Sequence, residues 1–200
     1  ERREVQMGDV TETITKSIRV TYSRDWNAYN GAQTEEKAKF VELLADLCSR
    51  IPQPVQATGR PRLPLSDATF AVIYKVYCGF SARRFMTDLG EARDAGLIAQ
   101  APHFNSVCNY MADPEMTPIL RELIAASAAP LANVEHDFAI DSSGFASSQY
   151  MRWYSEKYGR EVSEHDWIKA HISVGVTTQI VTAVEVTDRY GADSPQFAPL

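Results

Sequence analysis

The chain has few cysteines and no long apolar run, and each scarcity argues against a class of protein. Its three cysteines, Cys48, Cys78 and Cys108, are widely spaced in 200 residues and form no CxxC pair or Cys/His cluster. This argues against a disulfide framework or a structural zinc site and favours free thiols in a reducing compartment. No apolar run approaches the roughly 20 residues that cross a bilayer, and the N-terminus is polar. We therefore expect a cytoplasmic protein without a membrane span or signal peptide.

The charge is distributed unevenly along the chain. The net charge of −6 is unusual for a protein that binds nucleic acid, but residues 50–84 carry six basic side chains against one acid. Residues 131–200 hold ten acids against five bases. A basic segment followed by an acidic one fits DNA contact beside a carboxylate metal site, although ordinary charge scatter over a soluble surface gives the same pattern.

Most of the first 130 residues are predicted to be helical. Thr34 is expected to cap a helix that carries apolar residues at helical spacing and ends near Arg50, while residues 1–33 show no decisive period beyond a candidate strand at Ser17–Tyr22. Residues 51–65 hold four prolines and a glycine, which predicts an extended linker. Further helices are expected to start at Ser66, Ser81, His103 and Asp113, and Pro130 is expected to end the last.

Strands are predicted only after residue 130. Phe138-Ala139-Ile140 is a short apolar run that reads as a buried strand ending in Asp141, and a bare acid there calls for a partner. Trp167–Thr177 alternates apolar and polar residues, and Gln179–Thr187 is again rich in Val, Ile and Thr. The two segments predict an antiparallel hairpin. A strand ending in an acid, followed by a hairpin, fits the start of a ribonuclease-H-like fold and also fits many other α+β proteins.

Family resemblance favours the first of these. The segments FAIDSSGF, RWYSEKYG, WIKAHISVGVTTQIVTAVEVTD and DSPQF occur in that order, after YNGAQTEEKAKFVELLADLC, GRPRLPLSDATFAVIYKVYCGFSARRFMTDL and HFNSVCNYM. Together they resemble bacterial insertion-sequence transposases of the D-D-E type, in the insertion-sequence four/five group, from about residue 25 onward. The resemblance implies a mixed α+β chain: an N-terminal segment with one helix (1–50), a proline-rich linker (51–65), a helical DNA-binding region (66–130) and a partial ribonuclease-H-like catalytic domain (131–200).

The resemblance also implies a metal site. In this family three carboxylates hold two Mg²⁺ or Mn²⁺ ions that activate a water, and then a DNA 3′ hydroxyl, for attack on phosphodiesters. Asp141 matches the first carboxylate, although Asp137 on the same strand face is an alternative ligand. The second and third acids are expected beyond Leu200, so the chain is expected to be an inactive fragment of the intact enzyme. Asp193 is a weaker metal candidate, because beside Ser194 and Pro195 it also suits a helix cap.

The implied partner is double-stranded DNA, both transposon ends and target, and a homodimer is left open. The residues expected to contact DNA are Arg60, Arg62, Arg83, Arg84 and Lys169. The alternative function is a catalytically inactive DNA-binding remnant that occupies transposon ends. A half-domain that serves only in assembly is a third reading. A serine hydrolase built on Ser142 or Ser143 is disfavoured, because no GxSxG turn is present.

Overall fold

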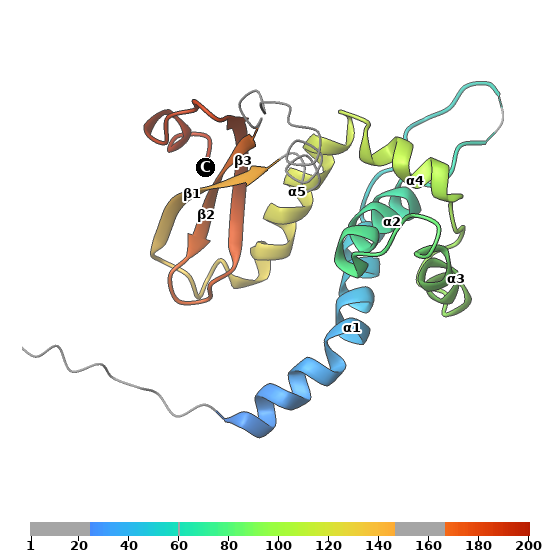
Figure 1. Ribbon diagram of the computed structural model, residues 1–200, viewed down its shortest axis with the longest axis horizontal. Helices are drawn as coiled ribbons and strands as arrows, with labels where there is room; N and C mark the ends of the chain where they lie inside the picture. Colours follow the sequence, from blue (N-terminus) through green and yellow to red (C-terminus); the bar gives the residue numbers. More distant parts are fainter. Residues whose placement is uncertain (1–24, 60, 147–166) are drawn as a thin grey trace, which may run out of the picture. The chain divides into compact units, whose positions relative to one another are not determined.

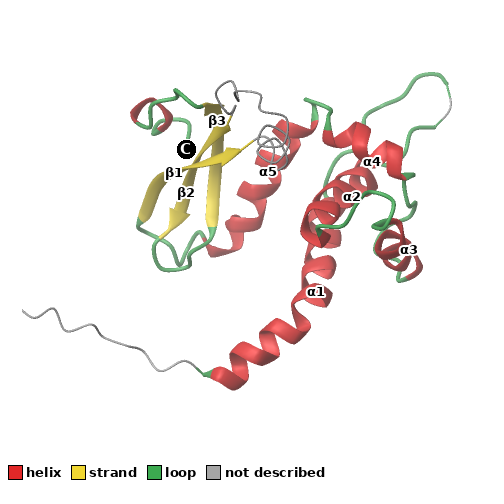
Figure 2. Ribbon diagram, in the orientation of Figure 1, coloured by secondary structure: helices red, strands yellow, loops and turns green. Residues whose placement is uncertain are grey.

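The structure, a computed structural model, describes residues 25–59, 61–146 and 167–200. The chain divides into two compact units, residues 1–37 and residues 38–200. The described residues form a mixed α+β fold of five α-helices, two short 3₁₀ helices and one antiparallel sheet, as Figure 1 and Figure 2 show. The mixed α+β class predicted from the sequence is therefore confirmed. The candidate strand at Ser17–Tyr22 lies outside the described residues.

The first helix, α1, runs from Trp26 to Ser49 and begins earlier than predicted. Asp25 Oδ1 accepts hydrogen bonds from the backbone amides two and three residues later, at 3.1 and 3.0 Å, and so satisfies donors that have no partner within the helix. Thr34, the predicted cap, lies inside the helix, where its hydroxyl donates to the carbonyl of Gly31 at 2.9 Å. The prediction chose the wrong cap because Asp25 and Thr34 both have side chains that can cap a helix, and they are only nine residues apart.

Four more helices follow a segment without regular structure. The predicted caps Ser66 and Ser81 are wrong, since Pro64 precedes α2 and Phe85 precedes α3 without a side-chain cap bond. The helix predicted from His103 to Met111 is confirmed as α4, and His103 caps it, because its Nδ1 accepts a hydrogen bond from Asn105 N at 3.3 Å. The helices are α2 (Leu65–Cys78), α3 (Met86–Asp94), α4 (Phe104–Met111) and α5 (Met116–Ala128), and the 3₁₀ turn η1 (Ala129–Leu131) carries Pro130.

The apolar faces of these helices form a buried core. Phe70, Phe85 and Leu89 are fully buried in it, and α1 contributes Cys48. Burial raises the pKa of the Cys48 thiol to about 12, with the charge of Asp67 adding to the effect, so this cysteine is an inert core residue. The cluster consists of Leu44, Cys48, Phe70, Ala71, Tyr74, Phe85, Leu89, Ala92, Ile98, Val107 and Leu123.

One buried carboxylate fastens α2 to the loop after α3. Asp67 is 6% exposed, and its Oδ2 accepts a hydrogen bond from the Gln100 amide at 2.8 Å. A buried acid is tolerated when its oxygens are hydrogen-bonded, so this contact fixes a loop that would otherwise leave an amide unpaired. In the described part of the chain, no helix has the length and apolar character that a membrane crossing requires.

Three strands form the sheet in the order β1-β2-β3. They are β1 (Phe138–Ala146), β2 (Trp167–Gly175) and β3 (Val181–Asp188), and both neighbouring pairs are antiparallel. The predicted hairpin is thus confirmed, with a bulge at Ser173/Val174 that the sequence did not indicate. Strand β2 is central, and β1 is an edge strand within the described sheet.

Helix α5 packs against the sheet beside β3, as Figure 1 shows. Arg121 on α5 donates to Glu185 on β3 at 2.7 Å, and the Glu185 side chain is 22% exposed. Glu185 is paired directly with His171 on β2, so both side chains lie on the sheet face that α5 covers. The helix therefore covers the face that carries the polar side chains of β2.

Leu89 tests the helical core. We expect Leu89→Ala to lower the free energy of unfolding by about 2–5 kcal/mol, because it removes a fully buried side chain from a packed cluster. Thr87→Ala, at an exposed position two residues before Leu89, is the control and should change stability by less than about 0.5 kcal/mol. Urea denaturation followed by circular dichroism measures both, and equal losses would contradict the placement of Leu89 in the core.

Candidate functional site

Asp141 lies in the middle of β1 and is exposed, not buried. It is paired with Ile172 across the antiparallel ladder, so it faces the side of the sheet opposite to His171. Its Oδ1 accepts a hydrogen bond from the Ser142 amide at 2.7 Å. The expectation of a buried strand ending in an acid is therefore wrong, because Ile140 and Asp141 point to opposite faces and the Asp141 side stays in contact with solvent.

The alternation predicted for β2 is present, but the covered side is the polar one. His171 and Ser173 are 0% and 4% exposed, whereas Ile168 on the other side is 50% exposed. Side chains that share the face of Ile168 include Phe145 of β1 and Val186 of β3, which are 51% and 46% exposed. At these positions of β2 the covered side chains are polar, the reverse of the usual one-sided sheet in a soluble domain.

Lys169, expected to contact DNA, is engaged on the covered face. Its Nζ lies 2.7 Å from Asp193 Oδ1 and donates to the Gly191 carbonyl at 3.1 Å. The ion pair connects Lys169 of β2 to the segment that follows β3. Its contact with DNA stays a prediction that would require this pair to open.

Asp193 is engaged by Lys169 and His171 and does not stand free for a metal. Hydrogen bonds from Lys169 and then from the Ser142 hydroxyl lower the pKa of Asp193, and the charges of Lys169 and His171 act in the same direction. These partners share the face opposite to Asp141, so the structure does not bring Asp141 and Asp193 together. The arrangement disfavours Asp193 as a metal ligand. Among the residues that the structure describes, no group of three His, Cys, Asp or Glu side chains is placed to bind a metal ion.

His171 is the most deeply buried polar side chain of this cluster. Its Nε2 lies 2.9 Å from Thr187 Oγ1, and its Nδ1 lies 3.1 Å from Asp193 Oδ1 without the alignment of a hydrogen bond. The sequence identified the shared strand face of Lys169 and His171 but not their common partner. The residues between β3 and Asp193 form turns, so no periodic pattern in the sequence predicts where Asp193 lies.

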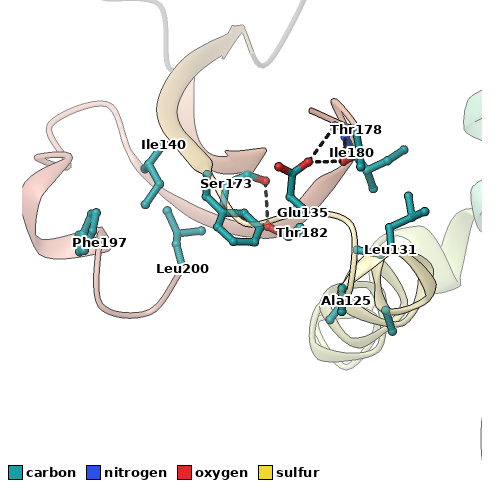
Figure 3. A pocket seen from close by; sticks show the side chains of 14 residues that line it. Ala125, Leu131, Glu135, Ile140, Ser173, Thr178, Ile180, Thr182, Phe197 and Leu200 are labelled. Carbon is teal, nitrogen blue, oxygen red and sulfur yellow. Dashed lines mark hydrogen bonds between the residues drawn. The ribbon is translucent and has the colours of Figure 1, made fainter. Parts of the chain in front are cut away.

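Glu135, which the sequence did not single out, holds the turn between β2 and β3. Its carboxylate accepts hydrogen bonds from the amides of Thr177 and Thr178 and from the Thr178 hydroxyl, at 2.8–3.2 Å, and Figure 3 shows this contact. These bonds, with the Thr178 amide the largest contributor, lower the pKa of Glu135 to about 2. A β-carbon on Gly175 would lie 2.6 Å from Glu135 Cδ, so glycine is required there. In the sequence, the close approach of Glu135 to the β2 backbone is indicated only by Gly175, an isolated glycine inside a predicted strand.

A pocket of about 500 Å³ adjoins Glu135 between the covered sheet face and the end of α5. Figure 3 shows Ile140 and Ser173 of the sheet, Ala125 of α5, and Phe197 and Leu200 of the last residues around this space. Ser173 Oγ accepts a hydrogen bond from Thr182 Oγ1 at 3.0 Å. The lining is thus mainly apolar, with polar groups that are satisfied within the protein.

The predicted DNA-binding arginines lie in the helical region, apart from Arg60, which is outside the described residues. Arg62, Arg83 and Arg84 are exposed. The guanidinium of Arg83 lies 5.2 Å from the ring centroid of Phe104, and that of Arg84 lies 4.8 Å from the ring centroid of Phe80. An aromatic ring orients a guanidinium without neutralising its charge. Both arginines therefore remain available to an anionic partner.

Glu135 has a pH-dependent effect on stability. Its pKa lies below the ordinary value of 4.5, so its contribution is complete above about pH 4.5 and is lost as the pH falls toward about 2. We expect Glu135→Gln to lower the thermal unfolding temperature at pH 7 and to flatten the decline between pH 4.5 and 2. Glu122→Gln, at an exposed position on α5, is the matched control. If the unfolding temperature of Glu135→Gln depended on pH as in the wild type, the stabilising role of the Glu135 carboxylate would be contradicted.

Comparison of the chain with protein-family models, with curated proteins and with solved structures found no match.

Proposed function

We propose that this chain is part of a DNA transposase of the D-D-E type and that residues 131–200 belong to its ribonuclease-H-like catalytic domain. Two things support the proposal. The ordered sequence segments resemble the insertion-sequence four/five group, and the described sheet has the antiparallel order β1-β2-β3 with Asp141 in β1. Among the described residues no group of three His, Cys, Asp or Glu side chains is placed to hold a metal ion, so the proposal applies to the intact enzyme.

The exposure of Asp141 is the observation that carries the proposal. Its carboxylate lies in the middle of an edge strand and receives the Ser142 amide on one oxygen. Mg²⁺ and Mn²⁺ bind carboxylate oxygens and keep several waters, which requires a carboxylate that solvent can reach. The chemistry of this single ligand fits such an ion.

The residues of this chain would have limited roles in the reaction. Asp141 would hold one side of a metal pair, and the bound ions would supply charge neutralisation at the phosphodiester and a nucleophile at neutral pH. The helical region would contact phosphates through Arg62, Arg83 and Arg84, which positions DNA without reading its sequence. The network of Lys169, His171 and Asp193 lies on the other sheet face and would have no direct contact with the reacting atoms.

Asp141→Asn tests the catalytic assignment. In the polypeptide encoded by the whole reading frame, we expect this variant to abolish strand transfer of transposon-end DNA with Mg²⁺, because an amide is a poor ligand for a hard cation. Asp137→Asn is the comparison variant, because Asp137 is the alternative ligand and precedes β1 by one residue, and we expect it to retain strand transfer. Retained strand transfer in Asp141→Asn, or strand transfer by the 200-residue chain alone, would contradict the assignment.

The exposed arginines favour a second function, DNA binding without chemistry. Neither Arg83 nor Arg84 has an ion pair with a carboxylate among the described residues, and each is oriented by an aromatic ring. A chain that binds DNA through phosphate contacts would do so whether or not the metal site is complete.

Replacing these arginines tests DNA binding. We expect Arg83→Gln and Arg84→Gln each to weaken binding of a fluorescent DNA duplex and to reduce the salt dependence of log Kd by about 1. Fluorescence anisotropy over a salt series measures both effects. Arg93→Gln is the control, because the Arg93 guanidinium is paired with Asp94 at 2.7 Å. A duplex that binds equally well to all three variants would contradict a role for this surface.

A further inference from the structure

The residues after β3 fold back over the covered face of the sheet. The turn η2 (Ser194–Gln196) follows Asp193, and Phe197 and Leu200 then line the pocket of about 500 Å³, as Figure 3 shows. The backbone hydrogen bonds recorded within residues 191–200 of the described chain are local, as in the bond from Gln196 N to the Asp193 carbonyl at 3.0 Å. Side chains, not strand pairing, therefore hold this segment in place.

Apolar contact holds the segment weakly. Phe197 is 71% exposed although it lines the pocket, so little of its surface is removed from water. Buried apolar area is the main source of hydrophobic stabilisation, and this segment buries little of it at its largest side chain. A polar attachment must therefore account for most of the retention.

Asp193 provides that attachment. One carboxylate oxygen lies 2.7 Å from Lys169 Nζ and 3.1 Å from His171 Nδ1. The two partners on β2 are rigidly placed, because the Lys169 and His171 side chains are only 19% and 1% exposed. The Lys169 ammonium also binds the Gly191 carbonyl, two residues before Asp193. One lysine thus fixes the segment at two points.

We propose that residues 189–200 form a strap over this pocket and that Asp193 is its latch. Breaking the contacts of Asp193 with Lys169 and His171 releases the strap and opens the side of the pocket lined by Phe197 and Leu200. The sheet and α5 stay folded, because their hydrogen bonds and the turn bound by Glu135 do not involve the strap. The strap is independent of the proposed transposase function.

Hydrogen exchange tests the latch. We expect Asp193→Asn to speed amide exchange in residues 191–200 by about 5-fold, the size expected for a partly exposed ion pair, and to leave β2 and β3 unchanged. Asp46→Asn is the matched control, since Asp46 forms an exposed ion pair with Arg50 at 2.9 Å elsewhere in the chain. Exchange rates that match the control, or a rise of equal size in strap and sheet, would overturn the latch.

Two further variants separate the latch from a general loss of stability. Lys169→Met should also open the strap, and the Lys169→Met/Asp193→Asn double variant should open it by less than the sum of the two single effects, because both single variants remove the Lys169–Asp193 contact. Gly191→Ala should release the strap with Asp193 intact, since its β-carbon would lie 2.6 Å from Thr187 Cβ. Additive effects in the double variant, or a strap unaffected by Gly191→Ala, would overturn the proposal.

Discussion

The hydrogen-bonded carboxylate of Glu135 is the interaction on which the rest of the sheet depends. Glu135 precedes β1 in the sequence and binds the turn between β2 and β3. It therefore connects the start of β1 to the β2–β3 hairpin. Its bonds satisfy the backbone amides of Thr177 and Thr178 within the protein, and a hydrogen bond to a charged group is stronger than one between neutral groups. Because Glu135 lies over Gly175, the register of the hairpin and the position of β1 are fixed by the same side chain.

Fixing the register in this way sets which side chains share each face. A shift of one residue would exchange the two faces of β2 and bring Ile172 under α5 in place of His171. The covered face tolerates polar residues because each has a nearby partner: Glu185 has Arg121, His171 has Thr187, and Ser173 has Thr182. Burial of polar groups is therefore balanced by hydrogen bonding within the face, and the polar groups make its alignment specific.

The periodicity of the sequence predicted the helices and strands better than it predicted which of their faces are buried. The hairpin and the helix at His103–Met111 follow from local sequence patterns, and both are present. Alternation in β2 separated two faces correctly, but it cannot tell which face a helix from another part of the chain will cover. The exposure of Asp141 was missed for the same reason, because the apolar run before it was read as buried on both sides. The contacts of Asp193 with Lys169 and of Glu135 with Thr178 join residues 24 and 43 positions apart through irregular turns, where no period exists to detect.

The open apolar side of the sheet has a consequence for the behaviour of the chain in concentrated solution. Strand β1 is an edge strand within the described sheet, and its sequence, FAIDSSGFA, contains a single charged residue, Asp141. Flat apolar strands with unpaired edges associate with one another, and one charge in the middle of such a strand opposes this by repelling a like charge on an incoming copy. Asp141 is thus the one charge in β1 that would oppose pairing with the same strand of a second copy. A divalent ion bound there, as proposed above, would neutralise this charge and remove the repulsion.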